Sequence, residues 1–185
     1  KIGAEEKRKI LEEMKGKYPA KFAPEEKVFG QINRGDRIFI GTGCGEPQYL
    51  VHALVSYVEK HPKAFFDAEV LHVWTMGVAP YANETYQSNF RQNSFFIGND
   101  TVREAINKGI ADFTPIFLSQ VPRLFYRKMV PIDVALIQTS PPDHHGYMSL
   151  GVSVDITKAA TENAALVIAQ VNAHMPRVHG DTFIH

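Results

Sequence analysis

The sequence is poor in cysteine, in net charge and in long apolar runs, and each shortage excludes a class of protein. A single cysteine among 185 residues leaves no internal disulfide framework and favours a reducing compartment. The 20 basic and 20 acidic side chains cancel, so nothing points to a nucleic-acid or membrane-surface partner. No apolar run approaches the roughly 20 residues of a membrane span, and the charged amino terminus lacks the apolar core of a signal peptide. The composition predicts a soluble, cytoplasmic protein that binds neither nucleic acid nor membrane.

The sequence does contain enough apolar side chains for a sizeable core. Hydrophobic residues make up 44% of it, with 12 Phe and 7 Tyr, and the length suggests about one domain. Low-complexity segments and internal repeats are absent from the sequence.

Short apolar segments alternate with segments of helical periodicity along the chain. Strands are expected at 37–40, 68–76, 94–97, 111–118, 132–138, 147–154 and 165–171, and residues 181–185 look like a strand cut off midway. The helices expected between them include one from Pro24 to a C-cap at Gly35 and one from a cap at Asn99 or Asp100 to Gly109. This alternation predicts an α/β fold with an open, mostly parallel sheet and helices on both faces.

A glycine-rich turn follows the strand at 37–40 and leads into a helix. Residues 41–45 read Gly-Thr-Gly-Cys-Gly. Strand, glycine turn and helix together offer backbone N–H groups and a positive dipole end to an anion or a polarised carbonyl. Gly43, Gly45 and Pro47 are therefore candidate substrate contacts. The turn lacks the full pattern of a dinucleotide fingerprint or a P-loop, so a plain tight turn explains it equally well.

Two reactive side chains lie in or beside this turn. The thiolate of Cys44 would be favoured at a helix amino terminus, but no base is fixed beside it, and a small residue in a tight turn also explains it. A glutamate at position 46, in the first helical turn, is explained by the helix dipole. Neither is predicted to be catalytic.

Residues 77–92 are expected to form a long loop rich in Tyr and Asn. Loops of this length inside compact domains are often functional. The loop begins at the carboxyl end of a strand, the side on which open α/β sheets bind ligands. Gly77 and Val78 are therefore secondary candidates for substrate contact, whereas packing alone accounts for Tyr81.

A polar loop at 139–146 lies between the apolar segments 132–138 and 147–154. Two prolines in it remove backbone donors, and Gly146 can supply a positive φ. Because this loop and the glycine turn both follow parallel strands, they are expected to meet at the carboxyl edge of the sheet. Ser140, Pro141 and Gly146 are candidates to line a substrate pocket there. The alternative is that the prolines and the glycine merely shape a tight crossover.

The eight histidines raise the question of a metal site. His144 and His145 are adjacent and so cannot act as the i,i+4 pair of a zinc helix. His174 and His179 flank a proline turn with no obvious carboxylate partner. No metal site is predicted.

Three segments resemble the blocks of one known family. The segment from Gln138 to Asp143, continued from Gly146 to Gly151, is similar to the signature of the acetyl-CoA hydrolase/transferase family. That family includes the 4-hydroxybutyrate and butyrate:acetate CoA-transferases. The turn from Gly41 to Pro47 resembles its early glycine loop, and Arg103 to Asn107 with Ala111 to Pro115 resembles a third block. The blocks occur in the family's order and extend over most of the chain.

The resemblance implies the CoA-transferase type of open α/β fold, with residues 1–185 as the N-terminal domain. Family members have two similar halves, and their catalytic glutamate lies in the second half, which this sequence does not include. No catalytic residue is therefore expected in this chain, and the chain alone is expected to be inactive. The resemblance implies no bound cofactor, because coenzyme A thioester is a substrate. The implied partners are an acyl-CoA, a short-chain carboxylate, the C-terminal half of the same protein and further copies in a homo-oligomer.

The implied reaction moves CoA from acetyl-CoA or a similar acyl-CoA to a carboxylate such as 4-hydroxybutyrate or butyrate, through a glutamyl-CoA thioester. An acetyl-CoA hydrolase of the same family and a non-catalytic ligand-sensing α/β domain are the alternatives. A sugar-phosphate isomerase on a similar scaffold is a further rival, but no proton-transferring base faces the glycine loop convincingly.

Overall fold

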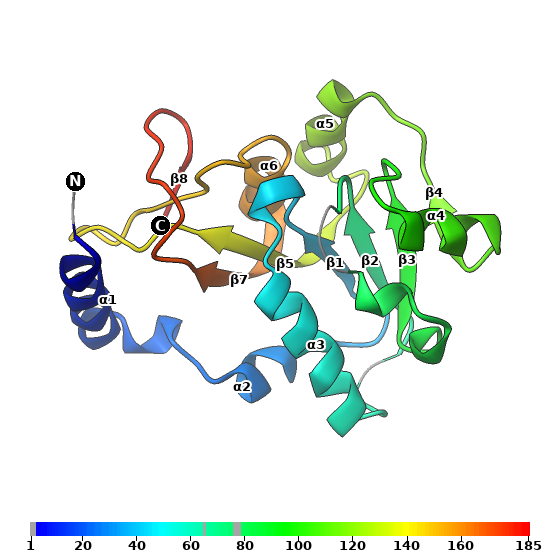
Figure 1. Ribbon diagram of the computed structural model, residues 1–185, viewed down its shortest axis with the longest axis horizontal. Helices are drawn as coiled ribbons and strands as arrows, with labels where there is room; N and C mark the ends of the chain where they lie inside the picture. The colour runs from blue at the N-terminus through cyan, green and yellow to red at the C-terminus, as the bar shows by residue number, and fades with distance from the viewer. Residues whose placement is uncertain (1–2, 65, 76–78) are drawn as a thin grey trace.

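A parallel β-sheet forms the centre of the molecule (Figure 1). The computed structural model describes residues 3–64, 66–75 and 79–185. Six strands lie in the order β4-β3-β2-β1-β5-β7, and the neighbouring strands are parallel. They are β1 (Arg37–Ile40), β2 (Ala68–His72), β3 (Phe90–Ser94), β4 (Ala111–Phe113), β5 (Ile132–Thr139) and β7 (Ala164–Val171). A separate antiparallel pair consists of β6 (Met148–Ser149) and β8 (Phe183–Ile184).

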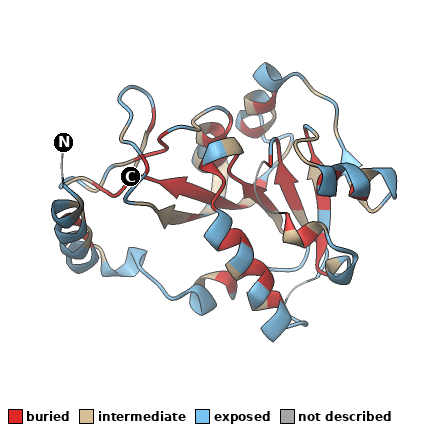
Figure 2. Cartoon of the chain, in the orientation of Figure 1, coloured by how far each residue is buried: buried red, intermediate tan, exposed pale blue. Residues whose placement is uncertain are grey.

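Helices cover both faces of the six-stranded sheet. They are α1 (Ala4–Lys17), α2 (Glu25–Phe29), α3 (Gln48–Lys60), α4 (Asp100–Asn107), α5 (Val121–Tyr126) and α6 (Thr157–Asn163), with short 3-10 turns η1 (Pro19–Lys21), η2 (Gly43–Gly45), η3 (Pro80–Ala82), η4 (Glu84–Tyr86) and η5 (Leu118–Gln120). One apolar core joins α2, α3 and α4 to the sheet, and a second joins α5 and α6 to its other face. Figure 2 shows buried strands beneath helices whose outer surfaces are exposed. The predicted open α/β fold is confirmed. Within the described residues, no helix is both long and apolar enough to cross a bilayer.

The central strand β1 shows why this sequence forms such a sheet. Ile38 and Ile40 belong to the core on the α3 face, while Phe39 between them belongs to the core on the α5 and α6 face. All three side chains are fully buried. Successive side chains of a strand point to opposite faces, so a strand covered on both faces must be apolar at every position. The predicted range 37–40 is confirmed.

The order of the strands reverses beside β1. From β1 the chain proceeds through β2, β3 and β4 to one edge, and it then returns to add β5 and β7 on the other side. Open α/β sheets bind ligands outside the carboxyl ends of the strands where the order reverses. A ligand site is therefore expected at the carboxyl ends of β1 and β5.

The third strand begins earlier than predicted. It spans Phe90–Ser94, whereas the apolar pattern predicted 94–97 and assigned residues 77–92 to a loop. Gln92 and Ser94 are polar but only 3% and 0% exposed, so hydrophobicity does not reveal that they belong to a buried strand. The described part of the expected loop also contains η3 and η4.

The predicted strand at 147–154 is wrong. Within that range only Met148 and Ser149 form a strand, which pairs with β8 outside the main sheet. Gly151 has a φ of +67° and turns the chain, so extended structure cannot continue through it. The next strand of the main sheet is β7, which agrees with the predicted range 165–171 to within one residue.

The ends of helix α2 and strand β4 also differ from the predicted ends. Helix α2 ends at Phe29 with Gly30 as its C-cap, and Gly35 instead adopts a φ of +77° in the turn before β1. Strand β4 has three residues in place of 111–118, because Pro115 lacks the N–H that would extend the ladder. The predicted cap of α4 is confirmed, since the Asn99 side chain accepts a hydrogen bond from the helical backbone.

Candidate functional site

The glycine turn lies at the carboxyl end of β1 and is bonded to its neighbours. The N–H of Gly41 donates to the carbonyl of Leu136 in β5 at 2.9 Å, and the N–H of Gly43 donates to the carbonyl of Trp74 at 2.8 Å. Gly43 has a φ of +54°, a conformation that favours glycine. The predicted strand, turn and helix are therefore present as β1, η2 and α3.

Gly45 is required by packing inside the turn. A Cβ atom on it would lie 2.7 Å from Ser153 Cβ, which is closer than such atoms approach. Its N–H donates to Ser153 Oγ at 3.1 Å. Beside it, Thr42 Oγ1 donates to Asp155 Oδ2 at 2.7 Å. The segment after β6 thus holds the turn in place, and the N–H of Gly45 serves the fold. Its predicted contact with substrate stays a prediction.

A polar cavity of about 400 Å³, which we call the site cavity, opens between the ends of β1, β5 and β7. It is lined by Gly43, Cys44, Glu46, Gln48, Gln138, Gln170 and Asn172. The structure therefore brings the glycine turn together with polar side chains from two neighbouring strand ends. This is the position at which the fold is expected to bind a ligand.

Three amide side chains of the site cavity form one hydrogen-bonded network. Gln138 and Gln170 are paired residues of β5 and β7. Gln170 Nε2 donates to Gln138 Oε1 at 3.3 Å, and Asn172 Nδ2 donates to the same oxygen at 2.8 Å. Gln138 Nε2 donates to the carbonyl of Glu46 at 3.2 Å. These bonds orient the amides and tie the ends of both strands to the glycine turn.

Sequence reasoning did not select these three amides as site residues. Gln138 was part of the family resemblance, whereas Gln170 and Asn172 ended an apparently ordinary apolar strand. The available signal was a polar residue at the carboxyl end of an apolar strand next to the reversal of strand order.

Buried polar groups continue from the glycine turn toward β2 and β3. Glu46 is 3% exposed and Tyr81 is 2% exposed. Burial raises the pKa of Tyr81 above its usual range, the Thr75 hydroxyl opposes this, and the charge of Glu46 adds to it. The ring nitrogens of His72 lie 2.9 Å from Thr75 Oγ1 and 2.9 Å from Gln92 Nε2. Burial lowers the pKa of His72 to about 4, so this imidazole and the Tyr81 phenol are neutral at pH 7.

The loop after β5 extends toward α1 (Figure 1). Ser140 is 1% exposed, and its hydroxyl accepts the N–H of Ser149 at 2.9 Å and donates to the carbonyl of Pro141 at 3.1 Å. Gly146 has a φ of +89°, and a Cβ atom on it would lie 3.1 Å from His185 Nε2. The structure thus places all three predicted residues away from the lining of the site cavity. Their contact with substrate stays a prediction.

The remaining sequence candidates fall in different places. Pro47 is buried at the start of α3, where its carbonyl accepts the N–H of Val51 at 3.0 Å. Cys44 is exposed at the site cavity. Gly77 and Val78 lie outside the described residues. Across the described ranges, no three His, Cys, Asp or Glu side chains gather as a metal ion would require.

The sequence matches one family of known proteins over nearly its whole length. The model of the acetyl-CoA hydrolase/transferase N-terminal domain matches residues 6–185. A 4-hydroxybutyrate coenzyme A transferase from Clostridium kluyveri is 46% identical over 168 residues, which cover 91% of this chain and 38% of that protein. A succinyl-CoA:acetate/propanoyl-CoA:succinate CoA transferase from Fasciola hepatica is 42% identical over 172 residues, which cover 93% of this chain and 35% of that protein. The chain thus spans between 35% and 38% of the length of these relatives.

Two solved structures share the fold. RipA from Yersinia pestis has a TM-score of 0.80 with 26% identity, over 92% of this chain and 41% of that chain. A 4-hydroxybutyrate CoA-transferase from Porphyromonas gingivalis has a TM-score of 0.71 with 27% identity, over 92% of this chain and 38% of that chain. This chain therefore belongs to the acetyl-CoA hydrolase/transferase family, and it matches the N-terminal domain of that family.

Proposed function

We propose that this chain is the N-terminal domain of a CoA-transferase, which moves CoA from acetyl-CoA or a similar acyl-CoA to a short-chain carboxylate such as 4-hydroxybutyrate or butyrate. The observation that carries the proposal is the 46% identity with a 4-hydroxybutyrate coenzyme A transferase over 91% of the chain. The site cavity supports it, because it lies where open α/β sheets bind ligands and its lining is rich in neutral hydrogen-bonding groups. Such groups suit a site that must hold a neutral thioester and a carboxylate in turn.

In the proposed reaction, the nucleophile is a glutamate carboxylate supplied by the C-terminal half. It attacks the acyl-CoA carbonyl, and CoA leaves as a thiolate while a mixed anhydride forms. The thiolate then attacks the glutamyl carbonyl of that anhydride, which gives a glutamyl-CoA thioester and releases the first carboxylate. The incoming carboxylate attacks this thioester and expels the thiolate again. Attack of the thiolate on the new acyl carbonyl completes the transfer and regenerates the glutamate.

The role proposed for this chain is to bind and polarise the acyl group. Each attack places negative charge on a carbonyl oxygen, and fixed hydrogen-bond donors aimed at that oxygen lower the barrier. We assign this role to the amides of Gln138 and Asn172, which are oriented by the bond between them and by the bond from Gln138 to the Glu46 carbonyl. The turn from Gly43 to Pro47 is proposed as one wall of the acyl pocket, and the loop from Ser140 to Gly146 is proposed to face the C-terminal half.

An acetyl-CoA hydrolase is the second candidate, because the matching family model covers hydrolases as well as transferases. The two activities share the acyl site and differ in whether water reaches the thioester. The test uses the purified full-length enzyme with acetyl-CoA, with and without butyrate or 4-hydroxybutyrate, and separates the products by liquid chromatography. Formation of the new acyl-CoA supports the transferase. Release of free CoA at a rate independent of added carboxylate supports the hydrolase. If the enzyme forms neither the new acyl-CoA nor free CoA, the proposal is overturned.

The role of the amide network is tested with Gln138→Ala in the full-length enzyme. We expect kcat for transfer to fall about 100-fold, the scale of losing one donor to a developing oxyanion. Gln87→Ala serves as the matched control, because this glutamine is exposed and lies outside the cavity lining. Thermal unfolding of both variants checks that the loss is not a folding defect. An unchanged kcat for Gln138→Ala would contradict the assigned role.

A further inference from the structure

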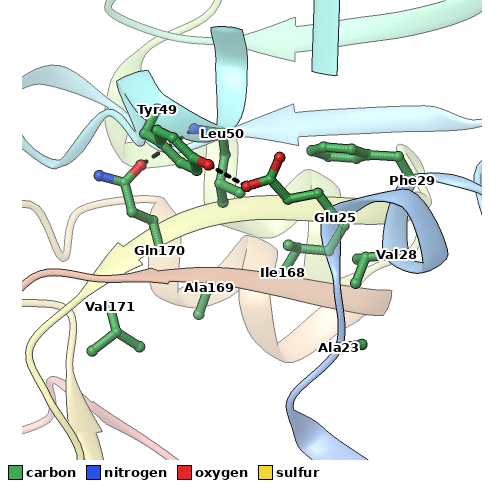
Figure 3. A pocket seen from close by; sticks show the side chains of 10 residues that line it. All are labelled: Ala23, Glu25, Val28, Phe29, Tyr49, Leu50, Ile168, Ala169, Gln170 and Val171. Atoms are coloured by element: carbon green, nitrogen blue, oxygen red, sulfur yellow. Dashed lines mark hydrogen bonds between the residues drawn. The ribbon is translucent and has the colours of Figure 1, made fainter. Parts of the chain in front are cut away.

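A second cavity lies beside the site cavity, between β7 and the helices α2 and α3 (Figure 3). It has a volume of about 310 Å³, and we call it the β7 groove. Seven of its ten lining residues have apolar side chains, among them Ala23, Val28, Phe29, Leu50, Ile168 and Val171. Three of these side chains, Phe29, Leu50 and Ile168, belong to the buried core on the α3 face. The groove therefore has hydrocarbon walls that the core holds in place.

The rim of the β7 groove is polar. The Tyr49 hydroxyl donates a hydrogen bond to the Glu25 carboxylate, and Figure 3 shows the two side chains pointing toward each other. Tyr49 is 58% exposed, so this bond faces solvent. An apolar interior with a few fixed polar groups is the usual composition of a small-molecule pocket.

Gln170 lines both the β7 groove and the site cavity. Its Oε1 accepts the N–H of Leu50 at 3.3 Å, and its Nε2 donates to Gln138 Oε1 at 3.3 Å. Both distances are at the long end for such bonds. The amide of Gln170 thus forms a partition between a polar cavity and an apolar one.

We propose that the β7 groove receives the hydrocarbon end of the acyl group and that Gln170 is the specificity-determining residue that limits its length. The inference rests on the proposed function, because it places the acyl carbonyl in the site cavity. A short acyl group ends before the partition. A longer aliphatic group, such as hexanoyl, has to displace the Gln170 amide before its methylenes can leave water for the apolar walls. The enzyme therefore prefers short acyl groups although an apolar groove lies behind its site.

The experiment compares carboxylate acceptors of increasing length in the full-length enzyme, with butyryl-CoA as the CoA donor so that transfer to acetate and to hexanoate each gives a new product. The measured quantity is the ratio of kcat/KM for hexanoate to kcat/KM for acetate. Gln170→Ala removes the partition, and we expect the ratio to rise about tenfold, the lower end of the discrimination per methylene in an apolar pocket. Gln87→Ala is the matched control, since it removes the same side chain from an exposed position outside both cavities.

A second variant keeps the test independent of how well Gln170→Ala folds. Ala23 is exposed and lines the groove from the α2 side, so Ala23→Phe fills the groove without touching the partition. We expect this variant to lower the hexanoate-to-acetate ratio about tenfold and to cancel the gain in the double variant. If every variant transfers CoA to acetate and the hexanoate-to-acetate ratio is the same in all of them, the inference is overturned and the proposed function stays intact. Absence of transfer to any carboxylate by the unmodified enzyme would overturn both.

Discussion

Acidification is expected to destabilise this domain through one buried histidine, His72 of β2. The side chain is 1% exposed, and burial lowers its pKa from 6.5 to about 4. Between these values the unfolded chain binds a proton that the folded chain excludes, so the free energy of unfolding falls as the pH falls. The contribution of the neutral His72 to the free energy of unfolding is fully present above pH 6.5. It is lost as the pH falls from 6.5 to about 4. At about 1.4 kcal/mol per pH unit, the interval corresponds to about 3 kcal/mol.

The perturbation that isolates this contribution is His72→Gln. A glutamine amide stays neutral across this pH range and can still bond Thr75 or Gln92, which are the present partners of the ring. At pH 7 we expect the variant to be less stable, because it loses the ring that packs 6.1 Å from the Tyr81 ring. Toward pH 4 the difference between the two proteins is expected to shift by about 3 kcal/mol in favour of the variant.

The assay is hydrogen exchange of the full-length protein, followed by mass spectrometry on peptides that cover β2 and β3. Opening free energies are compared between pH 7 and pH 4 after correction for intrinsic exchange rates. His52→Gln on the exposed side of α3 is the matched control, and we expect it to keep the pH dependence of the unmodified protein. The same pH dependence in His72→Gln as in the unmodified protein would refute the reasoning that His72 is buried and neutral.

Two further predictions concern glycines that the sequence singled out. Gly45→Ala is expected to destabilise the domain by about 1–3 kcal/mol in denaturant unfolding, because its Cβ would lie 2.7 Å from Ser153 Cβ, and Ser153→Gly should restore most of the loss if that contact is the cause. Additive effects in this double-variant cycle would contradict the steric explanation. Gly146→Val is expected to lower the melting temperature as well as the activity, since φ is +89° and the new side chain would meet His185 and Tyr18. An unchanged melting temperature would contradict it.

The sequence by itself determined the elements in which consecutive apolar residues are buried. Strand β1 was predicted over its full range because each of its residues from Ile38 to Ile40 is buried in one core or the other. The cap of α4 was predicted because Asn99 bonds the backbone three residues away, which is a local interaction. The alternation of such segments was sufficient to predict a parallel α/β sheet, since the pattern reflects coverage on both faces.

Tertiary structure alone decided which polar residues meet. Gln92 belongs to a buried strand because His72 lies beside it on the neighbouring strand, a partner 20 residues away that no local pattern reveals. Ser149 pairs with Phe183 instead of extending the main sheet, and the Ser140 hydroxyl accepts the N–H of Ser149 outside the lining of the site cavity. Such contacts depend on the register between distant strands, which hydrophobic periodicity does not encode.

In the candidate site, too, one part could be predicted from the local sequence and another part depends on tertiary contacts. The sequence located the glycine turn, because a turn with a positive φ at Gly43 requires glycine locally. The amides of Gln138 and Gln170 come together only because the parallel pairing of β5 with β7 places them side by side at the carboxyl edge, 32 residues apart in the chain. Polar groups that satisfy one another across strands carry no signal in either strand alone, so only the fold brings them to the candidate site.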